Sequence, residues 1–244
     1  MIQHRLQTIA DEFWSRVGDS EPFPRMLEDA LIWSLPLSVT QLPGLSTKSV
    51  QSWLLQREIQ LMLAAQNRAL HACVVAFRGS GFIFLDSDNN LSERRFSTAH
   101  EIGHFLLDYW EKRQLAISRF GPSIEDVIDG IRPATVEERV HSMLSEVQIT
   151  PFTHLMERKA DGQLGCDSLQ RSELHADSLA LELLAPYETV KDRVNSRRKQ
   201  DRQTYVQEIL VADFGLPPQV AQKYMKAFQL QEADSSSVRK WLGI

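Results

Sequence analysis

The sequence predicts an α+β fold in which a small β-sheet precedes a long helix and a helical tail closes the chain. Two β-rich runs, residues 70–77 and 81–85, flank Arg78-Gly79-Ser80, which is typical of a hairpin turn. Apolar residues then recur at helical spacing over residues 93–113. Because the pattern beyond residue 172 is also helical, we expect strands only in the first part of the chain.

The other elements are each predicted from periodicity and turn signals. Residues 46–67 fit both a helix and a strand, and that choice stays open. Residues 118–171 read as an insertion of loops around one helix, whose start is marked by the Thr135 and Glu138 capping box. The remaining predicted elements are helices at 3–17, 25–33, 172–184, 205–214 and 220–228 and a strand at 35–39. We expect a domain at 1–186 and a helical subdomain at 187–244.

Composition narrows the class of protein. The chain has 244 residues, 43% of them apolar and 24% charged. Its formal net charge of -5 gives no overall electrostatic attraction to nucleic acid. Two cysteines are too few for a disulfide framework. The amino terminus lacks the apolar core of a signal peptide, and about 18 consecutive apolar residues occur nowhere. We therefore expect a cytoplasmic protein with no membrane partner.

A metal-binding motif lies in the helix predicted at 93–113. His100-Glu101-Ile102-Gly103-His104 has two histidines four positions apart, so both imidazoles lie on one helix face and can reach one ion at about 2.0–2.1 Å. A carboxylate beside them can accept a proton from water that a zinc ion activates. The pattern predicts hydrolytic chemistry with His100 and His104 as metal ligands and Glu101 as the base.

A catalytic zinc site needs a third protein ligand. Asp108 lies one more turn along the same helix, but three donors in one row cannot converge on an ion, so a structural role is favoured. Glu173 lies four positions before Asp177, so Glu173 can bind the metal while Asp177 orients a histidine. The candidates that remain open are Asp108, His141, His154, Glu173, His175 and Glu182.

Two segments together resemble the ImmA/IrrE family of metallopeptidases. They are RRFSTAHEIGHFLLDY at 94–109 and ELHADSLALELLAP at 173–186. The resemblance implies a zincin-like domain with a gluzincin-like site, Zn²⁺ as the cofactor and Glu173 as the third ligand. The chain departs from many members in the nearly seventy residues between His104 and Glu173.

The resemblance also implies an activity, a zinc-dependent endopeptidase that cleaves a helix-turn-helix repressor and so switches on stress or mobile-element genes. The alternative is a catalytically silent regulatory module that binds a repressor or DNA. An oxyanion donor is sought among His141, His154, His175 and Tyr109. The basic residues between Arg193 and Arg202 and the helix-turn-helix look of 208–228 leave nucleic acid as a less favoured partner.

Overall fold

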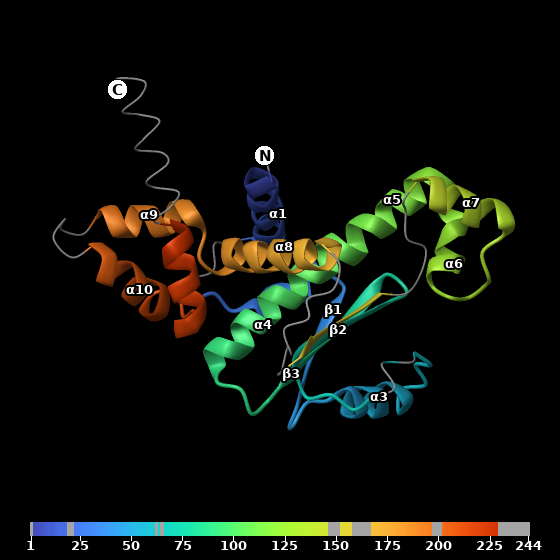
Figure 1. The fold of residues 1–244 in the computed structure, drawn as a ribbon, viewed down its shortest axis with the longest axis horizontal. Helices are drawn as coiled ribbons and strands as arrows, with labels where there is room; N and C mark the ends of the chain where they lie inside the picture. The colour runs from blue at the N-terminus through green and yellow to red at the C-terminus, as the bar shows by residue number, and fades with distance from the viewer. Residues whose placement is uncertain are drawn as a thin grey trace, which may run out of the picture.

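The computed structural model describes residues 2–18, 22–61, 63, 66–145, 152–157, 167–196 and 202–228. Its mixed α+β architecture, a small sheet with helices on both faces, confirms the predicted fold class (Figure 1). In chain order the elements are α1 Ile2–Val17, α2 Leu27–Ser34, β1 Leu37–Leu42, α3 Thr47–Leu55, β2 Leu70–Phe77, β3 Ser80–Asp86, α4 Leu91–His104, a π-helix Phe105–Trp110, α5 Glu111–Phe120, a 3-10 turn Pro122–Ile124, α6 Glu125–Ile128, α7 Val136–Ser145, β4 Phe152–Glu157, α8 Asp167–Leu184, α9 Tyr187–Asn195, α10 Arg202–Ala212 and a helix at 218–228.

The sheet has the strand order β1-β3-β2-β4. The predicted hairpin joins β2 to β3, and its two turn residues, Arg78 and Gly79, have φ of 51° and 75°, as a type I′ turn requires. β1 pairs with β3 in parallel, while β4 pairs with β2 in antiparallel. β3 is therefore an interior strand, and the sheet edge on the β2 side is formed by β4.

The two faces of the sheet support two separate apolar clusters. Side chains alternate along a strand, so Val74 and Ile83 join the larger cluster beneath α4, whereas Cys73 and Phe84 join a smaller one under α3. Figure 1 shows α4 on one side of the strands and α3 on the other. Residues 46–67, which fit two patterns, begin as helix α3.

A long continuous helix crosses the sheet. Asn90 and Glu93 form a capping box, in which each side chain accepts a hydrogen bond from the other residue's backbone N–H. The helical path continues through the π-helix and α5 to Phe120, beyond the predicted end at 113. Gly121, at φ 81°, ends it because a positive φ cannot continue a right-handed helix.

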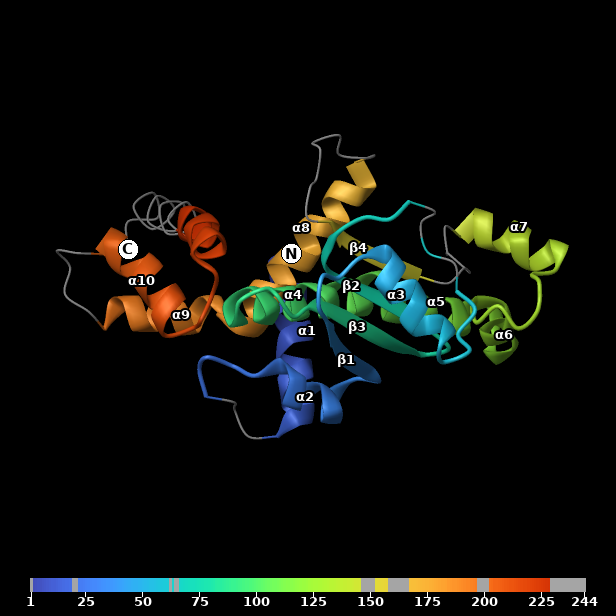
Figure 2. The ribbon, with the colours of Figure 1, turned by 90° about the horizontal axis from the view of Figure 1, so that it is seen from below.

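The insertion is more ordered than loops around one helix. α7 begins at the predicted capping box, where Thr135 N donates to Glu138 and Glu138 N donates to Thr135. The prediction missed β4, which pairs along the length of β2. α5, α6 and α7 extend away from the sheet at one end of the molecule (Figure 2).

The helices after residue 186 pack against the rest of the chain. Val190, Leu210 and Phe214 share one apolar cluster with Phe13 of α1 and Leu183 of α8. The division at residue 186 stays a prediction. Residues 197–199 of the basic segment lie outside the described part of the chain, and Arg193 pairs with Asp213. None of the described helices is long and apolar enough to cross a membrane.

Candidate metal centre

Helix α4 brings the motif residues into the interior. His100, Glu101 and His104 are all at most 3% exposed. The Nε2 atoms of His100 and His104, one helical turn apart, lie 3.1 Å from each other. Gly103 faces α8, where a Cβ would lie 3.0 Å from the backbone of Ala176, so glycine lets the two helices approach closely. The motif is thus clamped between the sheet and α8.

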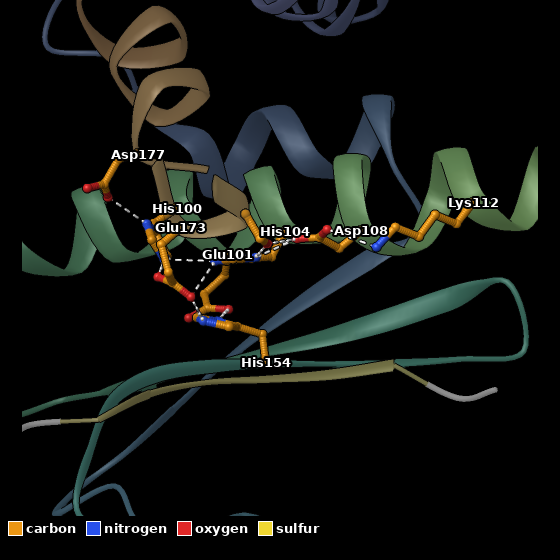
Figure 3. A network of polar contacts seen from close by, with 9 residues as sticks. His100, Glu101, His104, Asp108, Lys112, His154, Glu173 and Asp177 are labelled. Carbon is orange, nitrogen blue, oxygen red and sulfur yellow. Dashed lines mark hydrogen bonds and ion pairs between the residues drawn. The ribbon is translucent and has the colours of Figure 1, made fainter. Parts of the chain in front are cut away.

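Helix α8 supplies carboxylates to the same point. Glu173 Oε2 lies 3.5 Å from His100 Nε2, and Glu173 Oε1 lies 3.6 Å from His104 Nε2. One turn further along α8, Asp177 Oδ1 lies 2.9 Å from His100 Nδ1 (Figure 3). The structure therefore brings together His100, His104 and Glu173, and it sets Asp177 on the outer nitrogen of a histidine.

Strand β4 contributes a further histidine to the cluster. His154 Nε2 lies 2.9 Å from Glu173 Oε1, and His154 Nδ1 lies 3.0 Å from Glu101 Oε2. Its ring stacks on that of His104 with centroids 3.6 Å apart. Figure 3 shows the side chain rising from the strand toward α4. The sheet therefore forms the second wall of the site.

Asp108 does more than the structural role that sequence reasoning favoured. Its Oδ2 lies 2.8 Å from His104 Nδ1 and accepts a hydrogen bond of 2.5 Å from Ser172 on α8. Its Oδ1 accepts from Lys112. Asp108 lies in the π-helix, a distortion often found beside functional sites. Asp108 therefore orients His104 and ties the motif helix to the helix of Glu173.

The carboxylates favour positive charge at this cluster. Burial lowers the pKa of His100, but hydrogen bonds to Asp177 and Glu173 outweigh burial and raise that pKa to about 9. Burial likewise opposes a charged His154, yet Glu101 and Glu173 raise its pKa to about 10. Burial would raise the pKa of Glu173, whereas hydrogen bonds from three histidines hold it well below its usual range. A bound cation would supply the positive charge these acids favour.

The donor set suits a divalent metal ion. His100, His104, His154 and Glu173 each offer one ligand atom, and these four atoms lie within 4.8 Å of one another. Imidazole nitrogen with a carboxylate oxygen is a common set for zinc and for other transition metals. Glu101 Oε1 is buried and has no hydrogen-bond partner among the described residues, so a polar group is expected there.

The other sequence candidates lie elsewhere. Glu182 is at the far end of α8, where its carboxylate accepts from Tyr187 N. Tyr109 accepts a hydrogen bond from Gly79 N in the hairpin turn. His141 contacts Phe120, and His175 lines a separate pocket beside α1. None of these four belongs to the metal-capable cluster found in the described part of the chain.

Two contributions were not assigned by sequence reasoning. His154 was one of six candidates, and nothing favoured it over the others. A usable signal is the alternation of a strand, which puts His154 and Met156 on one face and Thr153 and Leu155 on the other. Asp108 stands four positions after His104, the spacing that pairs two residues on one helix face. That spacing is a usable signal for a residue that orients a ligand.

The comparisons with known proteins agree with this geometry. A search of curated proteins found no match. Residues 59–128, which include His100, Glu101 and His104 but not Glu173, match the model of peptidase family M78, described as the IrrE N-terminal-like domain. The part of the chain that contains the hairpin and the metal-binding motif is therefore similar to the IrrE N-terminal-like domain of this peptidase family.

Proposed function

We propose that the chain is a zinc-dependent endopeptidase with His100, His104 and Glu173 as metal ligands and Glu101 as the catalytic base. The observation that carries the proposal is the convergence of two imidazoles from α4 and one carboxylate from α8 on one point. Three such ligands leave a coordination position for chemistry, as catalytic zinc sites require. The match of residues 59–128 to a peptidase family supports the same reaction.

The zinc ion and the side chains around it would have separate roles in the reaction. Bound zinc would act as a Lewis acid that polarises the scissile carbonyl and makes water more acidic. Glu101 takes a proton from the attacking water and passes it to the leaving amine. Asp177 and Asp108 each accept the Nδ1–H of one histidine, which fixes the tautomer and directs the Nε2 lone pair into the cluster.

The edge of the sheet offers a seat for an extended peptide. β4 pairs only with β2 among the described strands, and it carries His154 beside Glu101. An added peptide strand would bond to the free edge through its backbone, which holds many sequences in one orientation. Backbone pairing of this kind would support endopeptidase activity on an unfolded or looped segment.

For the substrate we propose a helix-turn-helix repressor whose cleavage switches on stress or mobile-element genes in the cytoplasm. The support is the resemblance of 94–109 and 173–186 to the ImmA/IrrE family.

The deciding experiment incubates the zinc-loaded chain with the repressor encoded beside it and follows fragments by mass spectrometry. We expect defined fragments with the wild-type chain, none with chelator and none with Glu101→Gln, which removes the base but keeps the shape. Glu188→Gln, an exposed acid on α9, should cleave normally. Relief of repression by Glu101→Gln without cleavage would instead support the binding module.

A further inference from the structure

His154 is held in the cluster by the register of the sheet. It stands directly opposite Val74, so the two side chains lie on the same face. Val74 belongs to the apolar cluster beneath α4. The neighbouring Thr153 stands opposite Val75 and faces the other cluster, so only His154 of this pair can reach the metal centre.

The spacing of the donor atoms fits four ligands around one ion. Four donors in a zinc tetrahedron with bonds of about 2.0–2.1 Å lie about 3.3–3.4 Å apart. The distances here are 3.1 Å between the two motif Nε2 atoms, 3.5 Å from His100 Nε2 to Glu173 Oε2 and 3.6 Å from His104 Nε2 to Glu173 Oε1. His154 Nε2 lies 2.9 Å from Glu173 Oε1. All four donors lie within 4.8 Å of one another, and the ring of His154 has to turn out of its stack on His104 to direct Nε2 at a shared ion.

All three histidines are held in the same way. Each has its Nδ1 within 3.0 Å of a carboxylate: Asp177 for His100, Asp108 for His104 and Glu101 for His154. Histidines that bind metals characteristically donate the outer N–H to such a group. The side chain of His154 is only 11% exposed, so neither of its nitrogens is directed mainly to solvent.

We propose that His154 is a fourth protein ligand of the metal and that β4 thereby holds the resting site closed. This inference rests on the proposed metal site. A site with four protein ligands has no open position, and Glu101 is then engaged by His154. With zinc bound in this way, cleavage would require the imidazole of His154 to withdraw, which would free both a coordination position and the base. The strand that seats the peptide thus also gates the metal.

The ligand count tests the inference directly. X-ray absorption of the Zn²⁺-loaded protein should detect three imidazoles in wild type and two in His154→Ala. Competition with a chromophoric chelator should show Zn²⁺ binding weakened at least about ten-fold in His154→Ala, the lower end of losses from orienting residues alone. Two imidazoles in both proteins, or unchanged affinity, would overturn the inference.

A cysteine replacement covers the case in which the alanine variant does not fold. In His154→Cys loaded with Co²⁺ we expect a thiolate-to-metal charge-transfer band, because the new sulfur replaces the nitrogen. Thr153→Cys, on the same strand but the opposite face, should show only the wild-type spectrum. Absence of the band in metal-loaded His154→Cys, or its presence in Thr153→Cys, contradicts the assignment.

Activity separates this role from direct catalysis. If His154 closes the site, His154→Ala should cleave faster than wild type at saturating Zn²⁺, because the open position no longer depends on its departure. If it instead donates a hydrogen bond to the oxyanion, kcat should fall about 10²–10³-fold, and the inference is wrong. Failure of the metal site as a whole is distinguishable, because wild type would then bind no metal, or His104→Ala would bind it as well as wild type.

Discussion

Helix α4 and strand β4 form opposite walls of the candidate metal centre. They place their residues there through different kinds of structure, one local and one long-range. α4 brings His100 and His104 together because four positions make about one helical turn. β4 brings His154 there because it pairs with β2, more than seventy positions earlier in the chain. Local spacing is visible in a sequence, whereas long-range pairing is decided by packing. Both walls contribute donor atoms to the candidate metal site.

The two regions also differ in how they are packed. α4 lies between the sheet and α8, and its second half is buried, including polar residues. The insertion that leads to β4 begins with α5, α6 and α7, which extend away from the sheet (Figure 2). Variants can therefore test whether the insertion is anchored to the body and whether α4 is as tightly clamped as its burial indicates.

The largest effect is expected at the base of the insertion. Arg113 on α5 is 5% exposed and pairs with Asp129, which follows α6, and with Glu125. Arg113→Ala leaves the Asp129 carboxylate, which is only 10% exposed, without its partner, which should lower the free energy of unfolding by about 3–5 kcal/mol. Urea unfolding measures this. Arg139→Ala, at an exposed position on α7, should change the free energy of unfolding little. Equal losses in the two variants would show that Arg113 does not anchor the insertion.

The close approach of α4 and α8 gives the next test. In Gly103→Val the new side chain meets the backbone of Ala176, so the helices must separate at a cost of about 1–3 kcal/mol. Zn²⁺ binding should weaken as well, since Glu173 lies one turn before Ala176. Gln114→Val, exposed on α5, places the same β-branched side chain on a helix without the clash. A variant that unfolds and binds like this control would show that the two helices are not clamped.

The predictions from sequence follow this division between local and long-range order. The hairpin, the capping box at Thr135 and the motif helix were predictable because each depends on residues a few positions apart. The roles of Glu173 and Asp177 were predicted through their spacing on one helix together with a family resemblance, and they stay predictions. β4 was missed because its short pattern becomes a strand only when β2 is beside it. The helix beyond residue 113 was missed because α5 buries only Arg113 and Ala116, so its apolar periodicity is weak.

Replacing the carboxylates that contact Nδ1 of the two motif histidines should affect only metal binding, and the expected effect is smaller. Asp108→Asn and Asp177→Asn should each weaken Zn²⁺ binding about 10–100-fold, measured by competition with a chelator. Asp108 should matter more, since its side chain is 13% exposed and also bonds Ser172 and Lys112, whereas Asp177 is 46% exposed. The exposed Asp192→Asn serves as the control. Equal losses at the two sites would show that the link to α8 adds nothing.

The smallest effect is expected on α7, whose apolar face is open. Sequence patterning makes this helix as amphipathic as a core helix, but Val136, Val140 and Met143 are 70%, 48% and 80% exposed. Met143→Gln should therefore change the free energy of unfolding by no more than about 0.5 kcal/mol. Ile102→Ala, fully buried on α4, should cost about 2–5 kcal/mol in the same urea titration. A loss above about 1 kcal/mol at Met143 would mean that this face of α7 is covered in solution, and the contrast in packing between α7 and α4 would narrow.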